Sequence, residues 1–143
     1  MREDQEVRAI ADRLHSAAIH LLRMVRKQDA LMGEGPARLS ALSVLVFGGP
    51  MTLGRLAAAE QVKPPTMSRI VAGLKRKGLA ATITDAADAR KIRIQATTKG
   101  VRLMQRGRKR RIQSLAALIA GLEAGELETI DRAVASLERV LRK

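Results

Sequence analysis

Two narrow apolar stripes, one at each end of the 143-residue chain, constrain the fold most strongly. In the first 25 residues, apolar side chains recur every three or four residues, which is the period of an amphipathic helix. From residue 127 onward the same pattern recurs at spacings of 3, 4, 3 and 4. Stripes this long and narrow are hard to bury in one small core, so we expect them to pair two copies of the chain, with packing inside a single chain as the alternative. The expected dimer-interface residues are Val7, Ile10, Leu14, Leu127, Ile130, Val134, Leu137 and Leu141.

A strong excess of basic side chains predicts a polyanionic partner. The chain has 27 Lys and Arg against 14 Asp and Glu, which gives a net charge of +13. Nucleic acid and an anionic membrane surface both fit that charge. No apolar run approaches the roughly 18 residues that a membrane helix needs, and the first 13 residues lack a signal-peptide core. We therefore expect a cytoplasmic protein that binds nucleic acid and no membrane.

The scarce residue types narrow the function further. The absence of cysteine excludes disulfides, thiol nucleophiles and Cys-ligated zinc. His15 and His20 lie about 140° apart around a helix, so they cannot bind one metal ion from a single face. The single aromatic residue, Phe47, leaves little for the base stacking on which RNA and single-strand binders rely. We expect double-stranded DNA as the partner, with no cofactor, no metal and no catalytic residues.

The middle of the chain has the pattern of a helix-turn-helix. Thr52 suits the N-cap of a short helix over 53–59. Pro64 suits the first turn of a second helix, which Gly78 would end. The apolar face of that second helix comprises Met67, Ile70, Val71 and Leu74.

The opposite face of the second helix carries small polar and basic side chains. Small residues near the helix start allow its backbone to approach the floor of the major groove, and Thr66 and Ser68 are such residues. Arg69 can read guanine through a bidentate bond to O6 and N7. The alternatives are a phosphate contact for Arg69 and a bond to the helix backbone for Ser68.

Two alternating stretches, 79–84 and 91–97, predict a β-hairpin directly after this helix. A basic hairpin in that place acts as a wing, which can insert an arginine into the narrow minor groove. Arg90 is the candidate, with an ordinary solvated arginine as the alternative. We expect Asp88 to form the turn and to orient the Arg90 guanidinium by a charge-assisted bond.

Five segments of this region match one family pattern in order and spacing. They are TLGRLA at 52–57, VKPPTMSRIV at 62–71, LKRKGL at 74–79, DAADAR at 85–90 and ATTKG at 96–100. Together they resemble the MarR family of winged helix-turn-helix regulators of bacteria and archaea. The resemblance implies a mainly α fold with a small β-hairpin wing (α+β), a homodimer with interleaved terminal helices, and a pseudopalindromic operator. Members of this family commonly repress genes and release DNA when a small-molecule effector binds.

The resemblance also implies which residues contact DNA. The major-groove positions of the family fall on Pro65, Thr66, Ser68 and Arg69, and its minor-groove wing position falls on Arg90. The full set of expected DNA-binding residues is Thr52, Lys63, Pro65, Thr66, Ser68, Arg69, Arg76, Asp88, Arg90, Lys91 and Lys99. No effector-binding residue is assigned.

Several positions depart from the family pattern. Lys63 replaces the usual Ser or Thr cap, so a phosphate contact would replace a capping bond. Glu60 and Gln61 occupy the usual Leu-Gly turn, and Ala89 and Ala96 replace a common Arg and Leu in the wing. Without Trp or Tyr, the chain cannot stack a phenolic ligand in the usual manner, which leaves either a Met- and Leu-lined pocket or no effector.

We expect one compact domain with three segments: an N-terminal dimerisation helix over 1–36, the winged helix-turn-helix over 37–100 and C-terminal dimerisation helices over 101–143. The leading function is a sequence-specific transcriptional regulator, more specifically a repressor. A non-specific architectural DNA-binding protein is the alternative, because a dimer of this charge would bind any duplex. An enzyme is disfavoured, since the sequence offers no Ser–His–Asp set, no plausible carboxylate pair and no phosphate-binding glycine loop.

Overall fold

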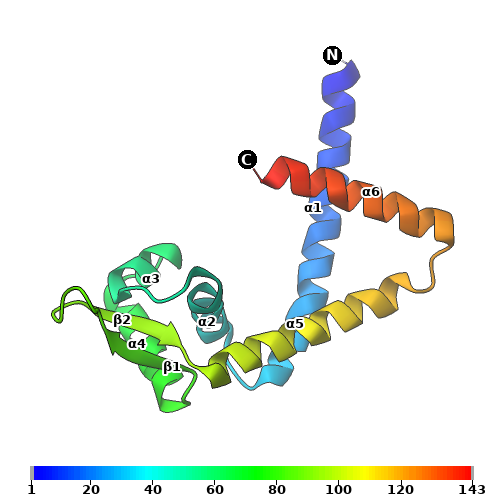
Figure 1. Ribbon diagram of the computed structural model, residues 1–143. Coiled ribbons are helices and arrows are strands. Elements are labelled where there is room, and N and C mark those ends of the chain that lie inside the picture. Colours follow the sequence, from blue (N-terminus) through cyan, green and yellow to red (C-terminus); the bar gives the residue numbers. More distant parts are fainter. Residues whose placement is uncertain (1, 143) are drawn as a thin grey trace. The chain divides into compact units, whose positions relative to one another are not determined.

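The computed structural model describes residues 2–142. It consists of helices and one short β-hairpin (Figure 1). The elements in chain order are α1 (Arg2–Asp29), η1, a 3-10 turn (Ala30–Met32), α2 (Pro36–Gly48), α3 (Leu53–Ala59), α4 (Pro64–Arg76), β1 (Ala80–Thr84), β2 (Ile92–Ala96), α5 (Thr98–Ile119) and α6 (Ala124–Leu141). The hairpin lies between α4 and α5 in the sequence. The predicted fold class, mainly α with a small β-hairpin wing, is confirmed.

The chain divides into two compact units, Met1–Lys109 and Arg110–Lys143. The first unit holds every element from α1 to β2 and the first part of α5. In the second unit α6 begins with a capping box, in which the Glu126 side chain accepts a hydrogen bond from the Glu123 backbone and the Glu123 side chain caps the first turn. The buried core lies in the first unit.

The described helices contain no single membrane-length apolar segment. Only the two segments Glu3–Met32 and Pro36–Gly48, taken together, reach the length and composition of a span, and they are bent by 92° at the break between them.

Glycine and proline set the limits of the early helices. η1 ends at Gly33, which adopts the left-handed conformation with a φ of 75°. Pro36 occupies the first turn of α2, where a missing N–H costs no hydrogen bond, and Gly49 follows the last residue of that helix with a φ of 77°. The apolar residues between Leu39 and Val46, followed by Gly48, Gly49 and Pro50, predict a helix over 38–47, and the structure lengthens it by two residues at the start and by one at the end.

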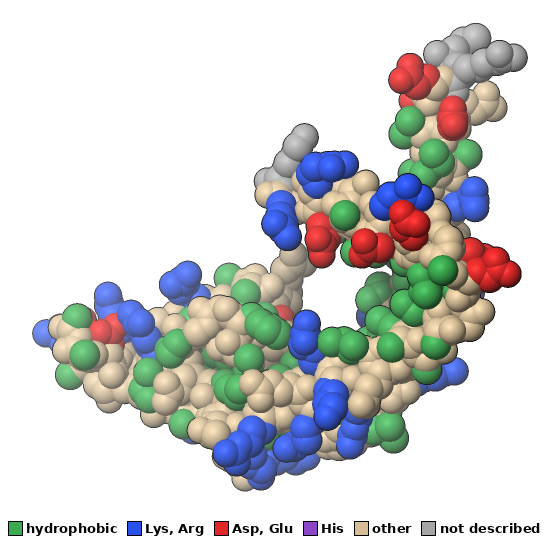
Figure 2. Space-filling view, turned by 45° about the vertical axis from the view of Figure 1, so that its right-hand side comes forward, with side chains coloured by type: hydrophobic (Ala, Val, Ile, Leu, Met, Phe, Trp, Pro, Cys, Tyr) green, Lys and Arg blue, Asp and Glu red, His purple; other side chains and the backbone are tan. Residues whose placement is uncertain are grey.

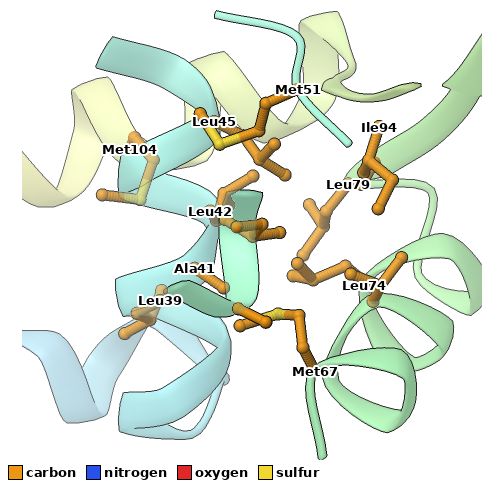
Figure 3. Packing of buried hydrophobic residues seen from close by; sticks show 14 residues of the cluster. Leu39, Ala41, Leu42, Leu45, Met51, Met67, Leu74, Leu79, Ile94 and Met104 are labelled. Carbon is orange, nitrogen blue, oxygen red and sulfur yellow. The ribbon is translucent and has the colours of Figure 1, made fainter. Parts of the chain in front are cut away.

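The core lies where α2, α3 and α4 pack against the hairpin (Figure 3). Leu42 of α2 is at its centre, with Met104 of α5 on one side and Leu74 and Leu79 on the other. The largest fully buried side chains are Leu42, Leu56, Met67 and Leu74. Each such burial stabilises the fold by about 1.5–3 kcal/mol relative to an exposed side chain. The apolar face of α4 is therefore anchored in the core over two turns.

The hairpin pairs β1 with β2 in antiparallel register, with Ala80 opposite Ala96 and Thr84 opposite Ile92. Met51 adds a third short segment through reciprocal backbone bonds with Ile94, of 3.1 and 2.8 Å. The alternating pattern of β2 puts Ile92 and Ile94 on one face, but only Ile94 is buried. Ile92 lies at the distal end of the strand, beyond the reach of the core.

Thr97 and Gly100 join the hairpin to α5. The Thr97 hydroxyl donates to the Gly78 carbonyl at 2.5 Å and accepts from the Gly100 N–H at 3.1 Å. A Cβ at Gly100 would clash with the Leu79 carbonyl oxygen and lie 3.0 Å from a methyl group of Leu42. The Thr-x-x-Gly pattern therefore reflects a cap and a close approach of two backbones.

The turn between α3 and α4 uses an unusual residue for its geometry. Gln61 has a φ of 55°, and it is the only non-glycine residue with a positive φ in the described chain. Its N–H donates to the Ala58 carbonyl at 3.1 Å, and the N–H of Val62 donates to the Ala57 carbonyl at 3.0 Å. The turn therefore keeps its hydrogen bonds without the usual glycine, at the cost of a strained backbone.

Replacing Gln61 by glycine is expected to raise the free energy of unfolding by about 0.5–1 kcal/mol, because the strain relieved exceeds the chain entropy that glycine adds. Urea denaturation of Gln61→Gly beside the wild type measures this difference. Gln61→Ala keeps the strain and is the matched control. A loss of stability in the glycine variant would contradict the strain argument.

Candidate nucleic-acid interface

The start of α4 offers exposed side chains to a ligand but few free backbone N–H groups. Thr52 caps α3, since its hydroxyl accepts from the Arg55 N–H at 3.3 Å. Lys63 precedes α4 with extended backbone and makes no side-chain capping bond, as its basic side chain implied. Pro64 and Pro65 have no N–H, so this helix end offers few amide donors to a phosphate. A phosphate contact at this end of the helix would therefore have to come from the flanking side chains.

α4 has one face fixed in the core and one face free. Met67, Val71 and Leu74 are buried. The predicted reading residues Pro65, Thr66, Ser68 and Arg69 are all exposed, and so is Arg76. Pro65, Arg69 and Arg76 recur at spacings of 4 and 7, so they share one side of the helix. The structure thus brings together small and basic side chains on a rigid, outward-facing surface.

The loop between β1 and β2 projects from the winged domain (Figure 1). Asp88 forms its turn: the carboxylate accepts from the Arg90 backbone N–H at 3.0 Å, and its carbonyl accepts from the Lys91 N–H at 2.9 Å. The expectation that Asp88 holds the Arg90 guanidinium is wrong, because its carboxylate bonds to the backbone amide instead. Arg90 and Lys91 are both exposed.

Asp85 and Arg93 make an ion pair at the base of this loop that the sequence did not predict. Their side chains approach to 2.9 Å, and the Asp85 carboxylate also accepts from the Ala87 N–H at 2.8 Å. The Ala87 bond and the Arg93 charge lower the pKa of Asp85 below its ordinary value. The carboxylate therefore stabilises the loop at neutral pH, and this contribution is lost only as the pH falls through the lowered pKa.

Lys99 lies at the opposite end of α4 from the reading residues. Its Nζ donates to the Lys77 carbonyl at 2.8 Å, so its charge sits at the helix C-terminus, where a cation is favourable. A 13-residue helix is about 20 Å long, which separates Lys99 from the start of α4. Lys99 as a DNA contact stays a prediction.

The basic side chains are unevenly distributed. Figure 2 shows Lys and Arg side chains around the hairpin at the left of the view and along the lower edge of the molecule. Residues 51–100 carry 10 Lys and Arg against 3 Asp and Glu, an excess of +7. Within residues 2–142, no group of three or more His, Asp or Glu side chains is placed to hold a metal ion. This positive charge favours the binding of a polyanion.

Comparison with known proteins shows which proteins resemble this chain in sequence. The sequence matches no protein-family model. It is 31% identical over 127 residues to an HTH-type transcriptional regulator of Mycobacterium tuberculosis, covering 89% of this chain and 88% of the relative. It is 28% identical over 130 residues to an HTH-type transcriptional regulator of Mycobacterium leprae, covering 91% and 90%. Both relatives are transcriptional regulators, a class of protein that does not comprise enzymes.

Several solved structures of bacterial proteins have the same fold. A MarR family protein from Bacillus stearothermophilus superposes with a TM-score of 0.80 at 23% identity, covering 98% of both chains. A transcriptional regulator from Thermotoga maritima gives 0.81 at 23% identity, covering 90% and 91%. A Staphylococcus aureus MepR mutant bound to an oligodeoxyribonucleotide gives 0.72 at 21% identity, covering 90% and 94%. With its helix-turn-helix, its wing and these relatives, the chain belongs to the HTH-type transcriptional regulators, and it has the fold of MarR family proteins.

Proposed function

We propose that the protein is a sequence-specific repressor of transcription that binds duplex DNA as a homodimer. The observation that carries this proposal is α4, whose buried face fixes its orientation while Thr66, Ser68 and Arg69 are exposed. In the major groove, such a helix places an arginine and two hydroxyl groups against base edges. Arg90 at the projecting wing would enter the adjacent minor groove.

The uncovered apolar stripes support the homodimer. Val7 and Ile10 of α1 are 59% and 57% exposed, and hydrophobic side chains are visible at the surface of that helix in Figure 2. Val134 of α6 is 46% exposed, and Leu141 is 80% exposed. Exposed apolar surface of this extent is characteristic of an interface. Neither stripe is covered by the rest of its own unit, so both are available to pair with a second copy.

A symmetric dimer implies a particular DNA target. Two α4 helices related by a two-fold axis would read two inverted half-sites, about 34–36 Å apart. A dimer bound there would occlude a promoter, which is the simplest route to repression. The family resemblance extends the proposal to release from DNA by a small-molecule effector. Since Phe47 is the only aromatic residue, aliphatic contacts would hold such a ligand.

A non-specific architectural role is the competing function, because the dimer would carry a formal charge of +26, twice the +13 of one chain. Selection of bound genomic fragments at low and at near-physiological salt separates the two. The proposal predicts one inverted repeat that survives the higher salt. Uniform recovery of fragments that disappears with salt would favour the architectural role and overturn sequence-specific repression.

Arg90→Ala is expected to weaken binding to sites with A·T-rich flanks by about 1–2 kcal/mol, and to weaken G·C-flanked sites less, because a narrow minor groove concentrates negative potential. Fluorescence anisotropy on two matched operators measures the difference. Lys91→Ala removes the same charge from the same loop and is the control, with similar losses expected on both operators. Equal losses for Arg90→Ala on both would reduce Arg90 to a phosphate contact.

A further inference from the structure

A nearly buried carboxylate links the segment before α2 to the end of α4. Glu34 follows the left-handed Gly33, and its side chain is only 5% exposed. One carboxylate oxygen lies 2.6 Å from Lys77 Nζ, and the other lies 3.3 Å from a guanidinium nitrogen of Arg38. Glu34 is thus clamped between the first turn of α2 and the residue that caps α4.

The end of α4 is held by further contacts from the same surroundings. Lys77 Nζ also donates to the Gly33 carbonyl at 3.4 Å, and Lys99 Nζ donates to the Lys77 carbonyl. The Arg38 guanidinium lies against Gly73, where a Cβ would be 2.6 Å from Nε. A side chain at position 73 would therefore require the Arg38 guanidinium to move. Together these contacts fix the C-terminal turn of α4 from three other segments of the chain.

Stability alone does not account for this cluster. Burying a charge costs free energy that an ion pair only partly offsets, so a buried pair is weak evidence for a stabilising role. Lys77 and Arg38 keep 47% and 36% of their side-chain surface exposed, so both cations remain hydrated without Glu34. What the cluster supplies is a defined geometry between two helices.

A small tilt at this point has a large effect at the DNA-reading end. α4 is about 20 Å long, so a tilt of about 10° about its C-terminus moves its N-terminus by about 3.4 Å, one base-pair step. On the other side, Glu34 follows the end of α1 by five residues, and α1 carries the apolar stripe of the proposed dimer. Glu34 therefore lies in the short connection that follows the helix proposed to pair the subunits, and its side chain bonds to the end of the helix proposed to read DNA.

We propose that Glu34 is a positioning residue that, through Lys77 and Arg38, sets the orientation of α4 relative to α1 and so selects the half-site spacing that the dimer accepts. This inference rests on the proposed function, because spacing has meaning only for a dimer on an inverted repeat. It goes further in assigning the choice of spacing to one ion-pair cluster outside the DNA-binding surface.

Operators in which the half-sites are moved apart or together by one and two base pairs test the proposal. The wild type should prefer one spacing by more than about tenfold, and Glu34→Gln should reduce that preference to within about threefold. Glu138→Gln is the matched control, because it makes the same charge change in an exposed pair with Arg142 at 3.8 Å. Sedimentation of each variant verifies that it remains dimeric.

A second variant keeps the test independent of folding. Lys77→Gln breaks the same ion pair from its half-exposed side, so it should flatten the spacing preference even if Glu34→Gln does not fold. The double variant should be no flatter than either single one, as expected for residues that act through one link.

The outcomes separate this inference from the proposed function. Glu34→Gln and Lys77→Gln proteins that keep the wild-type spacing preference, with or without lower stability, would leave Glu34 a structural residue and overturn the inference alone. A wild-type protein that binds all spacings equally would overturn the sequence-specific dimer, and the inference with it.

Discussion

Replacing Ile130 by aspartate is expected to make the protein monomeric and to lower its affinity for a full operator by about 10²–10⁴-fold. Ile130 lies in the middle of the α6 stripe and is 38% exposed in the single chain. A carboxylate there would have to be buried without a partner if two stripes pack together, which is strongly unfavourable. Once the dimer dissociates, each half-site is bound by a separate molecule, and the gain from binding both together disappears.

Sedimentation velocity reports the oligomeric state of this variant, and anisotropy on full and half operators reports its affinity. Ser136→Asp introduces the same charge about 120° around α6 from Ile130, on an exposed position, and should remain dimeric. Binding to a single half-site should be unchanged in both variants. An Ile130→Asp protein that is still dimeric, with wild-type affinity, would mean that the α6 stripe is not the subunit interface.

Arg69→Ala is expected to cost about 1–3 kcal/mol on the operator, roughly 5- to 150-fold, and to relax base preference at one position in each half-site. Arg69 is exposed on the free face of α4, in line with Pro65 and Arg76. The buried side chains on the opposite face keep the helix from rolling, so the loss of one bidentate contact cannot be compensated by a small rotation.

Binding of Arg69→Ala to a set of single-base operator variants, and to unrelated DNA, measures both effects. Arg55→Ala removes another exposed arginine, from α3, and should leave the base preference intact. If Arg69→Ala lost the same affinity on operator and on unrelated DNA, Arg69 would be a phosphate contact. The slope of log affinity against log salt concentration would then fall by about one.

The local signals in the sequence predicted the helix-turn-helix well. The bounds of α3 and the start of α4 are as predicted, and Thr52 and Pro64 determine the starts of the two helices through capping and backbone geometry within a few residues. Gly78, with a φ of 69°, ends α4 for the same reason. A helix end that is determined by residues close together in the sequence can therefore be predicted from the residue types alone.

Contacts that depend on tertiary packing could not be predicted in the same way. Glu34 and Lys77 are 43 positions apart in the sequence, and nothing local indicates that one charge neutralises the other. The alternation in β2 gave Ile92 and Ile94 equal weight, yet the core reaches only Ile94. Asp88 was assigned to the wrong donor on Arg90, because spacing alone does not distinguish a backbone amide from a guanidinium.

The most direct test of a dimer that reads an inverted repeat is a hydroxyl-radical footprint on a fragment selected from the source genome, at near-physiological salt. We predict two protected half-sites related by a two-fold axis, with centres about 10–10.5 base pairs apart. Minor-groove protection by the two wings should flank them. Protection without boundaries, spreading along the fragment as protein is added, would contradict the proposed function.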